Sequence, residues 1–371
     1  MLPAPSFRGS GLERRATLVH RSPFTVHPFT RSLVHSFIFS TSAVKYPPTS
    51  TLSQTPLSTA SPIRDRVLRA LALNRTPGYH YAGNFLEFSF DHVSEQDVRM
   101  SMAAGPHITS LNGNVDYSAL AVLADIAMAA NVRAGHTPAT RLATVQMNLQ
   151  FTGAPMTGTL RAQSTIQGYV EHITSLQAAT QVTVTANGRP VCYGMGAFMV
   201  LDPPKGVALY NMALRKDSDP AVAPLAEQAL NPVERKVLAL ADAALARAAA
   251  GEPFIQSFLG VHTRATEKGA TGALNNGPHV GNRVGHLQGG VTMGLGIATA
   301  EAALPASWML SAVTACYIRP GEGRVIRAKS KVIHHGRLTA VVRTEITGKD
   351  KRRVMEMITT HAHKALKPHS A

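Results

Sequence analysis

The sequence repeats one order of expected elements, and this duplication constrains the fold more than any other feature. Apolar periodicity predicts a helix, two strands, a long helix of small residues and four strands, first between residues 62 and 201 and again between 232 and 362. The string Arg161-Ala162-Gln163-Ser164 of one copy matches Arg327-Ala328-Lys329-Ser330 of the other. A long helix lying on a curved antiparallel sheet, twice over, predicts an α+β fold whose two sheets join edge to edge.

The repeat also sets the expected boundaries. In the first copy we expect helices at 62–73 and 117–132, and strands at 85–90, 97–103, 142–151, 158–169, 173–186 and 190–201. In the second copy we expect helices at 232–250 and 289–303, and strands at 258–266, 269–278, 308–319, 325–334, 337–347 and 352–362. The expected domains are an N-terminal domain at 61–203 and a C-terminal domain at 251–366, joined by a linker with a helix at 204–250.

The chain is basic, with 37 Lys and Arg against 22 Asp and Glu and a formal net charge of +15 over 371 residues. Much of the excess lies in residues 1–64, where 7 cations accompany a single acid, Glu13. The remainder leans toward the C-terminal end but shows no recognition-helix pattern, zinc-finger spacing or basic stripe interleaved with aromatic residues. We therefore expect no nucleic-acid partner, because a small phosphate-bearing ligand explains such a cluster equally well.

Residues 1–60 are rich in Ser, Thr, Pro and Arg and lack regular apolar periodicity, so we expect a disordered or targeting-like tail. Such a tail could be an organellar transit peptide or a stretch translated from a misassigned start codon. The two cysteines, Cys192 and Cys316, suggest neither a disulfide framework nor a metal site. No stretch reaches the roughly 18 apolar residues of a membrane span. We expect a cytoplasmic protein with no membrane partner, or a mitochondrial matrix protein if the tail is a transit peptide.

Two motifs, one at the start of a long helix and one inside the other, carry a family resemblance. Residues 282–291, Asn-Arg-Val-Gly-His-Leu-Gln-Gly-Gly-Val, resemble the Asn, then Leu-His-Gly-Gly, signature of phenylacetate-degradation-type hotdog thioesterases. Residues 123–128, Leu-Ala-Asp-Ile-Ala-Met, resemble the continuation of that signature. The resemblance covers about 62–202 and 232–365. It implies a tandem hotdog acyl-CoA thioesterase, with each curved sheet wrapped around a central helix.

In register, the two copies keep different parts of the family's site. The family's His-Gly-Gly falls on Asp116-Tyr117-Ser118 in one copy and on Gln288-Gly289-Gly290 in the other. The family's acid falls on Asp125 in the first copy and on Ile297 in the second. Because each site in the family spans two hotdog units, the resemblance implies one complete composite site, formed by Asp125 facing the 282–290 segment, and one abandoned site.

The resemblance implies a role for each residue of the complete site. Asp125 lies in an apolar stretch, where its pKa should be raised, and would act as a general base for water or as a nucleophile. Thr144 would position the water. Gly289, with Gly290, would offer backbone N–H groups at a helix start to the thioester oxygen. The alternatives are a buried Asp that ties down a neighbour and glycines that serve only close packing.

Two polar residues complete this expectation. Asn282 could bind the water or the carbonyl, or serve only as a turn residue. Gln288 replaces the family's His; an amide can donate a hydrogen bond but cannot act as an acid or base near neutrality, so we assign it orientation only. His286 is interpreted as a loop histidine. Leu120, Met128, Met293 and Trp308 would line the pocket for an apolar acyl group.

Coenzyme A is expected as part of the substrate, with no separate cofactor and no metal. His335-Gly336-Arg337 resembles the family's turn near the nucleotide, so Gly336 and Arg337, with Lys329 or Lys331, could meet its phosphates. The alternatives are a non-catalytic acyl-CoA-binding protein and a hotdog enoyl-CoA hydratase or dehydratase, whose Gly-Asp-x-Asn-Pro-x-His segment is absent. The fused chain could also form homo-oligomers.

Overall fold

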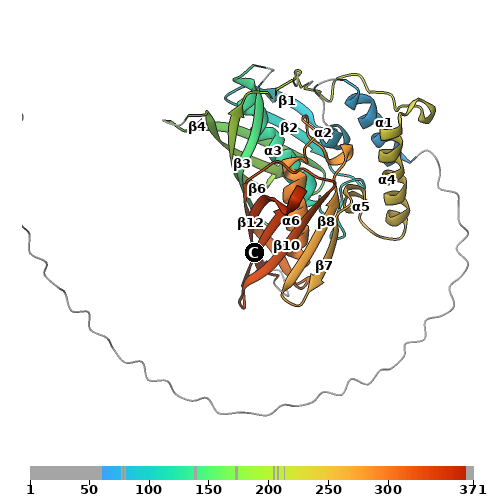
Figure 1. Cartoon of the computed structure of the whole chain (residues 1–371). Coiled ribbons are helices and arrows are strands. Elements are labelled where there is room, and N and C mark those ends of the chain that lie inside the picture. Colours follow the sequence, from blue (N-terminus) through green and yellow to red (C-terminus); the bar gives the residue numbers. More distant parts are fainter. Residues whose placement is uncertain are drawn as a thin grey trace, which may run out of the picture. The chain divides into compact units, whose positions relative to one another are not determined.

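The computed structural model of the chain describes residues 61–364, apart from residues 77, 79, 80, 138, 139, 172, 173, 204, 207, 208 and 213. The expected tail at 1–60 lies outside the described residues, as do the last two residues of the expected C-terminal domain. The expected domain boundaries remain predictions. The described chain contains one order of elements twice, as the repeat predicts (Figure 1).

The elements correspond between the two halves. The first half contains α1 (Pro62–Asn74), α2 (Tyr81–Leu86), β1 (Ser89–Val93), β2 (Val98–Ala103), α3 (Tyr117–Ala134), β3 (Arg141–Phe151), β4 (Thr159–Tyr169), β5 (Gln177–Ala186) and β6 (Arg189–Leu201). The second half contains α4 (Pro232–Ala249), α5 (Phe254–Leu259), β7 (His262–Thr266), β8 (Gly269–Asn275), α6 (Gly289–Glu301), β9 (Trp308–Tyr317), β10 (Val325–His335), β11 (Thr339–Thr347) and β12 (Arg353–His363). Short 3₁₀ turns lie at Glu227–Ala229, Pro278–Val280 and Lys349–Lys351.

The expected strands at 85–90 and 258–266 were wrong in their first residues, which belong to the short helices α2 and α5. Aromatic residues favour strands, but here they pack into a buried aromatic cluster, and this tertiary packing overrides the local preference. The rings of Phe85 and Phe258 lie 5.1 Å apart between centroids. Gly260 then ends α5 with a φ of 71°, a left-handed cap conformation.

A second repeat signal lies beside this cluster and was missed in the sequence. The tripeptides Gly105-Pro106-His107 and Gly277-Pro278-His279 occupy equivalent positions, and each histidine packs its ring against the cluster. Burial lowers the pKa of His107 to about 3 and that of His279 to about 4, so both rings are neutral. They serve as core residues.

The strands of the described chain form one 12-stranded sheet in the order β1-β2-β4-β5-β6-β3-β9-β12-β11-β10-β8-β7. The two halves meet where β3 pairs antiparallel with β9, with Gln146 opposite Cys316 and Gln150 opposite Ala312. This seam confirms that the two sheets join edge to edge. Because the pairing is antiparallel, the start of β3 lies beside the end of β9, and the end of β3 beside the start of β9.

The central helices α3 and α6 lie against each other inside the sheet (Figure 1). A Cβ on Gly290 would lie 2.4 Å from the backbone nitrogen of Val122, and one on Gly294 would lie 2.1 Å from Ser118 Oγ. Residues 118 and 122 of the first half correspond to residues 290 and 294 of the second half, at an offset of 172. The two contacts are therefore equivalent, with the halves exchanged. The helices are therefore related by an approximate twofold axis, and the small residues allow their backbones to touch.

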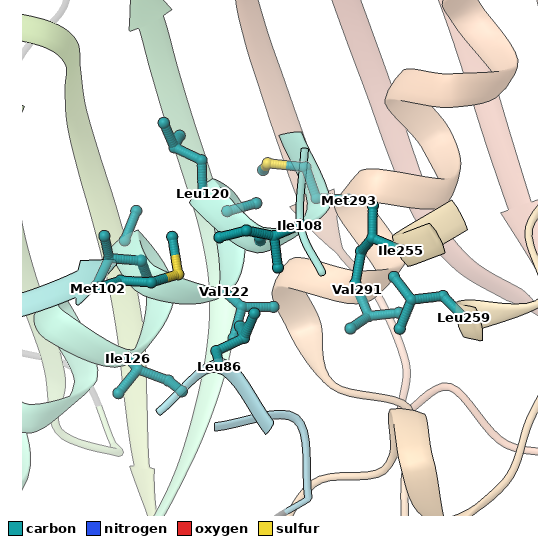
Figure 2. Close-up of a cluster of buried hydrophobic side chains, with 14 of the residues drawn as sticks. Leu86, Met102, Ile108, Leu120, Val122, Ile126, Ile255, Leu259, Val291 and Met293 are labelled. Atoms are coloured by element: carbon teal, nitrogen blue, oxygen red, sulfur yellow. The ribbon is translucent and has the colours of Figure 1, made fainter. Parts of the chain in front are cut away.

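One hydrophobic core serves both halves, as expected from this helix contact. Figure 2 shows a part of it, with Leu120 and Val122 from α3 and Val291 and Met293 from α6. Outside the core, α1 and α4 are tied together by ion pairs between Arg64 and Asp242 at 2.8 Å and between Arg75 and Glu234 at 2.6 Å. No helix in the described part of the chain has the length and apolar character needed to cross a bilayer.

Candidate active site

Asp125 is a buried carboxylate in the middle of α3, with 6% of its surface exposed. Its Oδ1 accepts a 2.8 Å hydrogen bond from Thr144 Oγ1, and its Oδ2 accepts a 2.7 Å bond from Gln288 Nε2. Thr144 lies beside a β-bulge in β3, a feature that often re-aims a side chain. The carboxylate therefore comes from the first half and one of its two donors from the second half.

Gln288 has two tasks, and together they fix its amide. It is the N-cap of α6: its Oε1 accepts a 2.9 Å hydrogen bond from the backbone N–H of Val291. The amide nitrogen must then point the other way, toward Asp125. A flipped amide would place its oxygen against the carboxylate and its NH₂ group against a backbone donor, so the observed orientation is the only one that satisfies both contacts.

Gly289 opens α6 directly in front of the carboxylate. A Cβ at this position would lie 3.1 Å from Asp125 Oδ2 and 3.5 Å from the ring of Tyr317. The backbone oxygen of Gly289 accepts a 3.0 Å hydrogen bond from Tyr317 Oη, which holds the helix start in place. The missing side chain leaves room for a small group between the carboxylate and the helix N-terminus.

Burial raises the pKa of Asp125 to about 6, although the hydrogen bonds from Thr144 and Gln288 and the charge of Arg133 lower it. Desolvation disfavours the charged form, and the donors offset only part of this effect. The carboxylate is therefore ionised near neutral pH and is a stronger base than an exposed aspartate.

A cavity of about 280 Å³ opens in front of this carboxylate. Its walls come from α3, the start of β3, the 282–289 loop and the end of β9, so both halves build it. Asn282 lines it, but Asn282 Oδ1 accepts hydrogen bonds from the N–H groups of Val284 and His286 and thus holds the loop. Leu120, Met128, Met293 and Trp308 are buried elsewhere and do not contribute to the described lining of this cavity.

The cavity contains polar residues that the sequence analysis missed. These residues are Tyr317, Arg133, Arg141, Arg283 and Arg319. Arg133 could have been found, since it follows Asp125 by eight residues and so lies about two helical turns along α3. The others come from loops and strand ends whose meeting depends on the seam between β3 and β9.

The equivalent position in the other half is built differently. Asp116 caps α3, with Oδ1 accepting from the N–H of Ser118 at 2.8 Å and Oδ2 accepting from Ser110 and Gln256. Tyr117 occupies the place equivalent to Gly289 and packs edge-on against Phe151, with 4.9 Å between ring centroids. Ile297, the counterpart of Asp125, is buried in the core.

The turn between β10 and β11 lies at this second end of the seam. The ring of His335 packs on Trp308, the first residue of β9, with 4.9 Å between centroids, whereas Tyr317 ends β9 at the Asp125 cavity. Nine residues of strand separate the two ends by about 30 Å. Lys329, Lys331, Gly336 and Arg337 therefore do not line the Asp125 cavity, and their binding of phosphates remains a prediction.

The basic turn at residues 335–337 lies at the opposite end of the seam from the Asp125 cavity. At the Asp125 end, β4 of the first half ends at Tyr169, and residues 172 and 173 of the following segment lie outside the described residues. Among the residues that the structure describes, no three His, Cys, Asp or Glu side chains are grouped to hold a metal.

No protein-family profile and no curated protein matches the chain, but solved structures do. A hot dog fold protein of unknown function from Alicyclobacillus acidocaldarius is similar over 77% of this chain and 99% of its own, at 10% identity and a TM-score of 0.47. An acyl-ACP thioesterase from Bacteroides thetaiotaomicron is similar over 71% and 97%, at 11% identity and a TM-score of 0.42. A Bacillus halodurans protein solved with CoA is similar over 38% and 98%, at 20% identity and a TM-score of 0.34.

The strand order and the central helices identify the fold. In each half an antiparallel sheet in equivalent strand order wraps one long central helix, and the two sheets continue into each other across β3 and β9. This confirms the expected α+β class. The chain is a tandem hotdog protein.

Proposed function

We propose that the chain is a thioester hydrolase with one working site, which acts on an acyl- or aryl-CoA. The observation that carries this proposal is the arrangement of Asp125, Thr144 and Gln288 around one carboxylate, in a cavity that also contains the glycine start of α6. An activated carboxylate next to unpaired helix N–H groups suits attack of water on a carbonyl. The twofold-related position has neither the acid nor the glycine.

Asp125 serves as the general base. It takes a proton from a water whose oxygen attacks the thioester carbon, and the tetrahedral intermediate then expels the sulfur. The same proton passes from Asp125 to the departing thiolate, which leaves a carboxylic acid and a free thiol. Its pKa of about 6 lets the carboxylate accept this proton and return it near neutral pH.

Gly289 provides the group that stabilises the negative charge on the thioester oxygen. As the first residue of α6, its N–H has no acceptor within the helix, and the positive end of the helix dipole favours a developing negative charge. The N–H of Val291 is already used by Gln288, which leaves the donors at the very start of the helix for the substrate oxygen. Thr144 and Gln288 hold the carboxylate, and Gln288 takes no proton itself.

A free-thiol assay on short-, medium- and long-chain and aryl acyl-CoAs tests this function. The wild-type chain should release thiol from at least one class, and Asp125→Asn should abolish that release while the protein stays folded. Asp116→Asn is the matched control, since Asn caps a helix as well as Asp does and the altered residue lies at the other end of the seam. Loss of activity in Asp116→Asn with retention in Asp125→Asn would show that the wrong end was assigned. Turnover that is unchanged in Asp125→Asn would exclude the mechanism.

A further inference from the structure

The Asp125 cavity has an excess of positive charge that the proposed hydrolysis does not use. Its described lining includes four arginines, at positions 133, 141, 283 and 319, and a single acid, Asp125. Both carboxylate oxygens of Asp125 are already engaged by Thr144 and Gln288. Asp125 therefore does not neutralise the positive charge of the four arginines around it.

Among the four arginines of the described lining, Arg133 and Arg283 each have a buried side-chain donor without a partner. Both are half-buried, and within the described residues the Nε of each is buried without an acceptor. Arg283 donates from Nη2 to the backbone oxygen of Tyr210. The five N–H donors of a guanidinium usually find partners when they leave water, so two unpaired Nε groups at the wall of one cavity show that both guanidinium groups are short of acceptors.

The two guanidinium groups also oppose each other. The pKa of Arg133 is lowered to about 10, first by burial and then by the nearby charge of Arg283, and Asp125 compensates only in part. Burial likewise lowers the pKa of Arg283. Two half-buried like charges destabilise a fold unless an anion lies between them. Glu322, outside the cavity lining, is already the partner of His286 at 3.3 Å.

Arg133 lies on the same helix as Asp125. Arg133 follows Asp125 by eight residues, which is about 12 Å along α3, and helix side chains lean back toward the N-terminus. The guanidinium lies close enough to the carboxylate for each charge to shift the pKa of the other. A substrate whose carbonyl lies at Gly289 would extend one of its ends toward this pair.

We propose that Arg133 and Arg283 form an anion-binding subsite for an anionic end of the substrate. The shared chemistry is a carboxylate or phosphate that accepts hydrogen bonds from both guanidinium groups. It could come from a carboxylate at the far end of the acyl group or from a phosphate of the thiol carrier. Its link to turnover rests on the proposed function, but binding of the anion does not.

Equilibrium binding tests the subsite without any turnover. Glutarate and inorganic phosphate should each raise the melting temperature of the wild-type chain, whereas the neutral diamide of glutarate should not. The rise should be lost in Arg133→Met and in Arg283→Met, which keep apolar bulk and remove the charge. Arg161→Met, an exposed arginine on β4, is the matched control and should keep the rise. An equal rise in all four proteins, or none in wild type, would overturn the proposal.

The stability of the unliganded variants separates a binding role from a structural one. Removal of an unpaired buried charge should leave Arg133→Met at least as stable as wild type without anion, because no native contact of its Nε is lost. A clear fall in melting temperature, with no change in anion binding, would assign Arg133 to the fold and contradict the subsite.

Matched thioesters then identify the source of the anion. Glutaryl and valeryl thioesters, each made with coenzyme A and with the phosphate-free carrier N-acetylcysteamine, form the four substrates. A preference for glutaryl on both carriers, weakened roughly tenfold to hundredfold in Arg133→Met, assigns the site to the acyl carboxylate. A preference for coenzyme A over N-acetylcysteamine that the variant weakens assigns it to a phosphate. If no thioester is hydrolysed while anion binding still depends on Arg133, the proposed function fails and the subsite stands.

Discussion

Gln288 Nε2 donates a 2.7 Å hydrogen bond to Asp125 Oδ2, although 163 positions separate the two residues in the sequence. The bond joins the N-cap of one central helix to the middle of the other. The same amide caps α6 through its oxygen, so the start of α6 and the carboxylate are positioned by one side chain. The second half therefore influences the chemistry of a residue that belongs to the first.

Asp125→Asn should stabilise the fold at neutral and alkaline pH while it removes activity. The folded-state pKa of Asp125, about 6, lies above the ordinary value of 3.8, so the acid favours the folded state when protonated. That contribution is fully present below about pH 4 and is lost as the pH rises through 6. Above pH 7 the variant should be more stable by on the order of 1–3 kcal/mol, and equal below pH 4. Urea unfolding across this pH range measures the difference, and a gap that does not vary with pH would contradict a buried, raised carboxyl.

The pH dependence of kcat/KM should show an acid limb near the pKa of Asp125. The carboxylate is the active form, so the rate should fall about tenfold for each unit below about pH 6. Initial rates in buffers of constant ionic strength define the limb. A rate that stays flat down to pH 4.5 would mean that another group accepts the proton.

Thr144→Val should move this acid limb to higher pH. The hydroxyl stabilises the charged carboxylate by its 2.8 Å bond to Oδ1, and this bond lowers the pKa of Asp125. Valine keeps the shape and removes the donor, so the carboxyl should hold its proton more strongly. The measurement is the kcat/KM profile of the variant beside that of Thr165→Val, which alters a strand hydroxyl outside the cavity lining and should leave the limb in place.

Alanine at two adjacent glycines should give opposite results. At Gly290 the new methyl would lie 2.4 Å from the Val122 backbone, which cannot yield, so Gly290→Ala should destabilise the fold by about 2 kcal/mol or more. At Gly289 the methyl would meet only side chains, Asp125 Oδ2 at 3.1 Å and the ring of Tyr317 at 3.5 Å, so Gly289→Ala should remain folded and lose turnover. Melting temperature and thiol release for both variants decide this, and full activity in Gly289→Ala would show that the substrate does not enter this gap.

Asp116→Ala should affect stability and leave catalysis intact. The side chain caps α3 and accepts two further hydrogen bonds, so its loss should lower the free energy of unfolding by about 1–2 kcal/mol. Thiol release per folded molecule should equal that of wild type. A fall in turnover without a fall in stability would restore a catalytic role to the second end of the seam.

The repeated order of elements and the edge-to-edge seam were predictable because they follow from periodicity and duplication. The pairing of Asp125 with Gln288 was predictable only through the register of two family motifs, since no local pattern joins residues so far apart. The helices α2 and α5 were not predictable, because buried ring packing decides their conformation. The position of Arg337 was not predictable either, because which end of a seam a turn occupies depends on the direction in which β3 meets β9.

The seam also sets the order in which the chain can become active during synthesis. Until β9 is made, β3 is an open strand edge that can pair with another chain, and the carboxylate of Asp125 lacks its amide partner. Contacts between residues so distant in sequence form late in folding. The edge of β3 therefore stays open while more than a hundred residues emerge between β6 and β9, and the Asp125 site can form only after the start of α6 and β9 have joined the first half.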